Sequence, residues 1–363
     1  MPLNLISKYR TELMGIAIIW IYLYHSGIVF ENSFFSHLFT FLKDTGYGGV
    51  DLFFFLSGFG LMQGMLKKKY SPLQFYRKRS LRILPTYWLV TSAVFAGQMI
   101  IRNDISILGI FLLELTTVGF FFKGFRYDWF IASLMTFYLV FPLFFLRYRN
   151  IVNKAFLIIA ITSSSLLFCA LIIPSQLNYL LIFTTRIPIF FIGAHVGYLS
   201  YANGMKITAR MRWLFFACLV GTFVSLIVIY SMYSSDERWH YGLWWYPFII
   251  GSCPICLFVA YALDKLNNTI GKNFFYTKML WVLNLCGRYS LEIYLLHASI
   301  VFKLGEKIWP NYECQYSVIR TLNKGHLAEY FLYFIITVAL SVPLHKLAVS
   351  LQRTFKEPAE HAG

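Results

Sequence analysis

Charged residues are scarce in this sequence, which excludes an ordinary soluble protein. Only 13% of the 363 residues are charged, whereas 58% are hydrophobic and 20% aromatic. A typical soluble domain has about 25% charged residues. Acidic residues are the scarcest, so the formal net charge is +16. A nucleic-acid-binding protein would gather such an excess on a soluble face. Here the apolar residues instead form runs of membrane-spanning length, so we predict a membrane protein without a nucleic-acid partner.

The sequence also lacks a disulfide framework, metal-ligand spacing and a cleavable signal. Most of its six cysteines fall in apolar runs, and the Cys253-Pro-Ile-Cys256 pair lies inside a predicted span, which favours core packing over redox chemistry. The eight histidines show no ligand-like spacing, so we predict no metal. The first apolar run, 16–30, has no small-residue cleavage site and is predicted to remain as the first span.

The apolar runs predict an all-α integral membrane protein with about ten transmembrane helices. Lys and Arg gather in the segments that become cytoplasmic when both termini are cytoplasmic, as the positive-inside rule requires. Under this topology the run 105–122 is a partly inserted or re-entrant external segment. We expect one polytopic domain over 1–350, a short cytoplasmic tail over 351–363, and contact with membrane lipid. The predicted spans are 12–30, 49–66, 84–101, 129–146, 154–173, 180–199, 213–233, 244–263, 283–303 and 328–348.

Ionisable residues inside these spans are candidate functional residues, because each costs a few kcal/mol to insert. His25 is predicted about 20 Å into the first helix, and Asp51 enters the second span near the same depth. A neutral histidine bonded to a neighbouring helix is the simpler interpretation. However, a carboxylate on one ring nitrogen fixes the tautomer, which leaves the other nitrogen able to act as a general base.

Further intramembrane charges lie in later spans. Arg288 and Glu292 are four residues apart, so one interpretation is that they pair with each other. His297, deeper in the same predicted span, has no obvious partner in the sequence. Arg186 cannot lose its charge, so we expect it to line a polar cavity or to meet a carboxylate.

A basic stretch over 67–85 contains seven positive charges and no acid. Its lysines are typical of a cytoplasmic anchor that contacts anionic lipid. Arg77, Arg79 and Arg82 lead directly into a span. Spacing leaves open whether they also anchor lipid or direct several donors at one phosphate group.

Several segments together resemble the membrane-bound acyltransferase-3 family, and they match nearly the whole chain in order. The segment 12–26 of the first span is similar to that family's first helix with its essential histidine, here His25. The most specific match is the segment around Asp51 and Ser57. The other matching segments are Phe75-Tyr-Arg77-Lys-Arg79-Ser-Leu-Arg82-Ile-Leu-Pro85-Thr-Tyr87-Trp88, Trp129-Phe-Ile, Tyr138-Leu-Val-Phe-Pro142, Arg186-Ile-Pro-Ile-Phe-Phe-Ile-Gly193 and Tyr289-Ser-Leu-Glu292-Ile-Tyr-Leu-Leu-His297.

This resemblance implies a ten-helix O-acyltransferase of a bacterial plasma membrane. Such an enzyme moves an acyl group, usually acetyl, from cytoplasmic acyl-coenzyme A to a hydroxyl of a cell-surface or lipid-linked glycan. Acyl-coenzyme A is then a co-substrate, and no permanently bound cofactor is expected. Two positions depart from the family pattern: Met14 stands where many members have arginine, with Arg10 nearby, and Leu134 stands where many have glutamate.

The hypothesis that follows makes His25 the general base and Asp51 the group that orients it. Arg77, Arg79 and Arg82 would hold the phosphates of the coenzyme. The residues expected to line the polar interior are Arg10, Ser57, Tyr87, Arg186, Arg288, Glu292 and His297. Two alternatives remain open: a transporter or flippase of a lipid-linked sugar, and a membrane scaffold for glycan synthesis. The sequence indicates neither the acceptor nor the oligomeric state.

Overall fold

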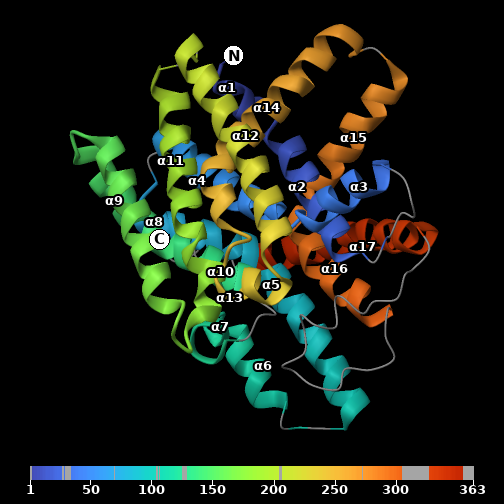
Figure 1. The fold of residues 1–363 in the computed structure, drawn as a ribbon. Coiled ribbons are helices and arrows are strands. Elements are labelled where there is room, and N and C mark those ends of the chain that lie inside the picture. Colours follow the sequence, from blue (N-terminus) through green and yellow to red (C-terminus); the bar gives the residue numbers. More distant parts are fainter. Residues whose placement is uncertain are drawn as a thin grey trace. The chain divides into compact units, whose positions relative to one another are not determined.

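The computed structural model describes residues 2–26, 28, 34–68, 70–103, 105, 107–124, 129–203, 207–271, 273–304 and 327–354. Every element in these ranges is helical (Figure 1). A helix satisfies its own backbone hydrogen bonds, as a segment in lipid must. The prediction of an all-α multi-pass membrane protein is therefore confirmed.

The described chain contains eight helical segments that are long and apolar enough to cross a membrane. Seven of them lie in α4, α5, α8, α9, α12, α14 and α17, and the eighth runs from the 3₁₀ turn at Asn178 through α10 into α11. The helix bounds are Gly48–Lys68 (α4), Pro72–Arg102 (α5), Trp129–Asn150 (α8), Lys154–Ile172 (α9), Leu181–Thr184 (α10), Arg186–Asn203 (α11), Ala209–Met232 (α12), Tyr246–Ile270 (α14) and Leu327–Thr354 (α17).

The other two predicted spans correspond to shorter helices. The first overlaps α2, Arg10–His25, which has 16 residues, and part of the predicted span beyond it lies outside the described residues. The predicted span 283–303 is interrupted at Tyr289, which separates α15, Phe274–Arg288, from α16, Ser290–Leu304.

The segment 105–122 forms two short helices, α6, Ile107–Leu115, and α7, Gly119–Lys123. Nine residues of α6 extend about 14 Å, less than half of a hydrocarbon core of roughly 30 Å. Neither helix can cross a bilayer alone, which agrees with a non-spanning segment. The predicted tail begins inside α17, and residues 355–363 lie outside the described ranges.

Contacts between α-carbons divide the chain into two compact units. Unit 1 comprises Met1–Ala17, Tyr47–Pro72 and Thr136–Gly287, and unit 2 comprises Ile18–Gly46, Leu73–Met135 and Arg288–Gly363. Each unit is built from segments that are far apart in the sequence. The expectation of a single domain over 1–350 stays a prediction.

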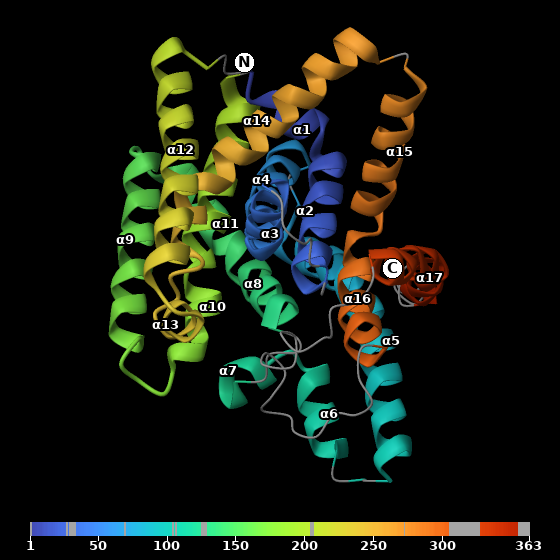
Figure 2. The same cartoon turned by 45° about the vertical axis from the view of Figure 1, so that its right-hand side comes forward.

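Unit 1 is organised around the close packing of α4 against α11, which lie side by side in both views (Figures 1 and 2). A Cβ at Gly58 would overlap the backbone of Phe190, and a Cβ at Gly193 would overlap the backbone of Phe55. Small residues allow membrane helices to approach this closely. Unit 1 also contains two short helices, α1, Asn4–Lys8, and α13, Ser235–His240.

Unit 2 contains α3, Phe34–Asp44, together with α5, α6, α7, α16 and α17. The Tyr22 hydroxyl donates to the Tyr330 carbonyl at 2.8 Å, and these two residues share a buried cluster with Ile28. The helices α16 and α17 are in contact (Figure 2). Two hydrogen bonds hold α6 beside α5, from the Tyr87 hydroxyl to the Glu114 carbonyl and from the Trp88 indole to the next carbonyl, that of Leu115.

Candidate active site

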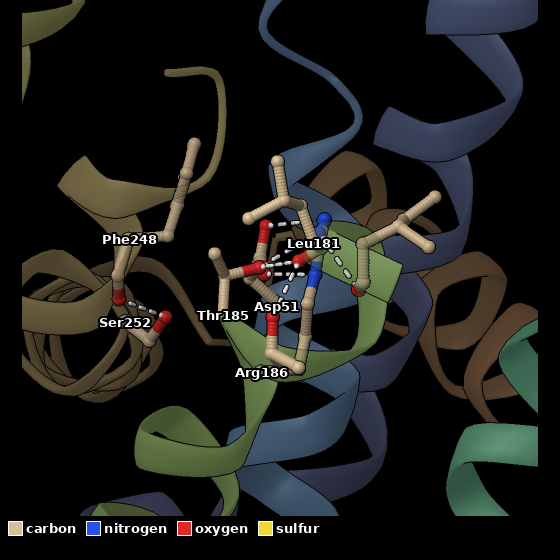
Figure 3. Close-up of polar contacts among 8 residues, drawn as sticks. Asp51, Leu181, Thr185, Arg186, Phe248 and Ser252 are labelled. Atoms are coloured by element: carbon tan, nitrogen blue, oxygen red, sulfur yellow. Dashed lines mark hydrogen bonds and ion pairs between the residues drawn. The ribbon is translucent and has the colours of Figure 1, made fainter. Parts of the chain in front are cut away.

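The most deeply buried charges in unit 1 form an ion pair between Asp51 and Arg186 (Figure 3). Asp51 lies in the first turn of α4 and Arg186 is the first residue of α11. Their side chains are 0% and 1% exposed. Nε of Arg186 lies 2.8 Å from Oδ1 of Asp51, and Nη2 lies 3.5 Å from Oδ2. The expected carboxylate partner of Arg186 is therefore Asp51.

The remaining surface of the Arg186 guanidinium is also occupied. Nη1 donates to the Ile182 carbonyl at 3.0 Å and to the Thr185 hydroxyl at 3.3 Å. The Trp245 ring lies 4.6 Å from the guanidinium carbon, in cation–π contact. A buried charge is tolerated only when it is paired and hydrogen-bonded, and Arg186 meets both conditions. The geometry suits a rigid positioning element at the start of α4 and α11.

Unit 2 brings His25 and His297 together, although they are 272 residues apart in sequence. His25 is the last residue of α2 and His297 lies in α16. Nε2 of His297 lies 3.1 Å from Nδ1 of His25, which is also 3.0 Å from the Ile21 carbonyl oxygen. His297 is 2% exposed, and its Nδ1 contacts the Tyr294 carbonyl oxygen.

These contacts determine which nitrogen of each neutral ring carries the proton. A carbonyl oxygen only accepts, so Nδ1 of His297 is the N–H donor to Tyr294. Nε2 of His297 is then an acceptor, and Nδ1 of His25 carries the hydrogen that faces both this nitrogen and the Ile21 carbonyl oxygen. The lone pair of His25 consequently lies on Nε2. This is the tautomer that a general base needs.

Nδ1 of His25 is therefore in contact with His297. The predicted contact between Asp51 and His25 joins residues of different units and stays a prediction. The sequence marked all three side chains, but the pairing of His25 with His297 had no sequence signal, because helix contacts between distant spans leave no local pattern.

Glu292 pairs with a residue that the sequence analysis did not single out. Its Oε1 lies 2.8 Å from Nδ1 of His345 in α17, and Glu292 is 4% exposed. Among the described ion pairs, Glu292 makes none with Arg288, which is exposed at the end of α15. The helix breaks at Tyr289, so the four-residue spacing does not place Arg288 and Glu292 on one helical face. An ionisable residue in the apolar run 328–348 was the signal that could have identified His345.

The other predicted residues lie on α2, α4 and α5. Arg77 and Arg82 are exposed on the first turns of α5, and Arg79 lies over the Phe75 ring at 5.7 Å. The Arg10 guanidinium lies against Gly60, where a Cβ would overlap it. Ser57 is buried in α4, and Tyr87 is buried in α5 with its hydroxyl on the Glu114 carbonyl.

The apolar helices and the ionisable side chains paired between them are typical of a polytopic membrane protein. The sequence model of the acyltransferase-3 family, described as an acyltransferase domain, matches residues 13–346. The chain belongs to that family and is an acyltransferase by that membership.

A curated relative resembles a short part of the chain. The exopolysaccharide production protein ExoZ of Rhizobium meliloti (strain 1021) is 39% identical over 54 residues. These residues are 15% of this chain and 17% of the relative, so the match spans about a sixth of the relative's length. No solved structure matches the chain.

Proposed function

We propose that this protein transfers an acyl group from cytoplasmic acyl-coenzyme A to a hydroxyl of a cell-surface or lipid-linked glycan, in a bacterial plasma membrane. The acyltransferase domain supports the reaction class. The name of the relative, an exopolysaccharide production protein, supports a polysaccharide acceptor. The observation that carries the proposal is the contact between His25 and His297, because it places the hydrogen of the neutral His25 ring on Nδ1 and the lone pair on Nε2.

In the proposed reaction, the acceptor oxygen attacks the thioester carbonyl while its proton moves to Nε2 of His25. The tetrahedral intermediate then expels the thiolate of coenzyme A, which takes the proton back from Nε2. One ester bond forms, one thioester bond breaks, and the products are the acylated glycan and free coenzyme A. Positioned general bases of this kind contribute about 10²–10⁴-fold to the rate.

His297 stabilises the transient imidazolium in this scheme. Protonation of Nε2 makes the His25 ring cationic, which strengthens the hydrogen bond from its Nδ1 to Nε2 of His297. The Tyr294 carbonyl holds the His297 ring in the matching tautomer. His297 is therefore a positioning residue for His25.

The arginines on the first turns of α5, of which Arg77 and Arg82 are exposed, are the proposed contacts for the coenzyme. Arg79 and Arg82 are three residues apart and are neighbours on one helix surface. Guanidinium groups hold phosphate oxygens through several charge-assisted hydrogen bonds. In this proposal Arg77 adds a third positive charge close by.

Mass spectrometry of surface glycans, from cells with and without this protein, tests the proposal. We expect the glycan to lose the mass of one acyl group per modified sugar when the protein is absent. That mass would also distinguish acetyl from succinyl or longer groups. Identical glycan masses, together with loss of glycan from the cell surface, would instead indicate a transporter or flippase.

A further inference from the structure

A second arginine in unit 1, Arg238 of α13, is buried and has no acidic partner among the described residues. It is 8% exposed, and no described ion pair includes it. The Tyr230 ring lies 4.2 Å from its guanidinium carbon and the Trp244 ring lies 4.7 Å from it. Two aromatic rings therefore contact this guanidinium.

Two buried N–H groups at this position have no hydrogen-bond acceptor among the described residues, Nη1 of Arg238 and Nε1 of Trp244. Trp244 is 7% exposed. A buried donor without an acceptor costs about 1–3 kcal/mol, and most such groups in native proteins are satisfied. Nε of Arg238 is bonded at 3.3 Å to the Ser234 carbonyl, so the orientation of the guanidinium is set by its own helix.

Local structure fixes α13 and the arginine on it. The Ser234 side chain accepts from the Glu237 backbone N–H, and the Glu237 carboxylate accepts from the Ser234 backbone N–H at 2.8 Å. This capping box holds the first turn. It also occupies the Glu237 carboxylate, which is the nearest acid in the sequence to Arg238. Among the described residues, the guanidinium of Arg238 therefore forms no ion pair with a carboxylate.

We propose that Arg238 and Trp244 form a binding site for a carboxylate of an acidic glycan. A carboxylate supplies oxygens for both unsatisfied donors and neutralises the guanidinium. A bound water molecule would accept hydrogen bonds but would not neutralise the charge. A lipid phosphate offers similar oxygens, but Arg238 is buried and lies on the polar segment Ser-Asp-Glu-Arg-Trp-His.

The site adjoins the Asp51–Arg186 pair through consecutive residues of unit 1. The Trp244 ring contacts Arg238, and the ring of the next residue, Trp245, contacts Arg186. The Tyr47 ring, just before α4, packs edge-on against Trp244 at 5.1 Å. The assignment of the acidic glycan as the acyl acceptor rests on the proposed function, whereas the carboxylate-binding site itself does not.

Isothermal titration of the full chain in dodecyl maltoside, without acyl-coenzyme A, tests the site with three probes. We expect trigalacturonate to bind and neutral maltotriose not to bind. Arg238→Gln should weaken trigalacturonate binding roughly ten- to hundredfold, because a charge-assisted hydrogen bond is lost. The matched control Arg210→Gln, at an exposed arginine of α12, should bind as the parent does.

Trp244→Phe removes the indole N–H but keeps a ring against Arg238, so it tests the site even if Arg238→Gln fails to fold. We expect several-fold weaker binding, with Trp213→Phe, at a residue 72% exposed, as its control. Unchanged binding in folded Arg238→Gln and Trp244→Phe proteins would overturn the site. Displacement of trigalacturonate by equimolar inorganic phosphate would overturn the carboxylate assignment in favour of phosphate. Acidic-glycan binding by a parent protein that transfers no acyl group would reject the proposed function and leave the site standing.

Discussion

Breaking the ion pair between Asp51 and Arg186 gives the most quantitative test of the structure. Both side chains are almost completely buried, and the closest approach of their charged atoms is 2.8 Å. Asp51→Asn leaves the guanidinium buried without a counter-charge, and removal of one partner of such a pair typically costs about 3–5 kcal/mol. Arg186→Met leaves the carboxylate in the same position and should cost a similar amount.

The double variant Asp51→Asn/Arg186→Met removes both charges together, so it should be about as stable as either single variant. The coupling energy then equals the cost of one single variant, about 3–5 kcal/mol, at or above the upper end for residues in contact. The free energy of unfolding is measured by titrating SDS into dodecyl maltoside micelles while tryptophan fluorescence is recorded.

The pair between Lys8 and Asp264 serves as the matched control. Its N–O distance is 2.6 Å, but the Lys8 side chain is 54% exposed. Solvent screens such a pair, so Lys8→Met should cost less than about 1 kcal/mol. The reasoning would be refuted if the losses of unfolding free energy in the two single variants added up in the double variant. It would also be refuted if Asp51→Asn lowered the free energy of unfolding as little as Lys8→Met.

Three further predictions follow from local contacts. His297→Ala should lower kcat about ten- to hundredfold with little change in KM. His297→Gln should recover part of the lost kcat, because its amide oxygen can accept from His25. Equal kcat in the parent and both variants would show that His297 has no part in the mechanism. Gly193→Ala should destabilise the protein by roughly 1–3 kcal/mol, because its methyl group overlaps the Phe55 backbone, whereas Gly221→Ala, with open space around its Cβ, should not, as thermal unfolding would show. The Ser234 hydroxyl and backbone N–H lower the pKa of Glu237, so the capping box is stable above the ordinary carboxyl range and is lost as the pH falls through the lowered pKa. In the parent protein, hydrogen-exchange protection of α13 should fall in that acidic range. In Glu237→Gln the protection should not depend on pH in that range.

The sequence predicted the helical membrane fold because a single local property, the length of each apolar run, determines it. It also marked His25, Asp51, Arg186, Glu292 and His297, since any ionisable group in an apolar run is costly and therefore conspicuous.

Long-range pairing could not be predicted in the same way. Asp51 meets Arg186 across 135 residues, and His25 meets His297 across 272. Such pairs depend on which helices pack together, and a single sequence contains no periodic signal for that. The break at Tyr289 was missed for a related reason, because the apolar run continues across it with no proline to mark the end of α15.

The Arg238 site was missed because Arg238 lies between the predicted spans 213–233 and 244–263, where an arginine is unremarkable. Only the structure shows that the guanidinium is buried between the rings of Tyr230 and Trp244. A solvated loop arginine and a buried one have the same local sequence signal, and the difference between them is tertiary.

The central claim is that Nε2 of His25 removes the proton from the acceptor hydroxyl during acyl transfer. The most direct measurement is the transfer of radiolabelled acetyl from acetyl-coenzyme A to an acidic oligosaccharide, by the parent and by His25→Ala protein in proteoliposomes at equal protein amounts. We expect the parent to label the oligosaccharide and the folded His25→Ala protein to be slower by about 10²–10⁴-fold. Equal labelling by the two proteins would contradict the account.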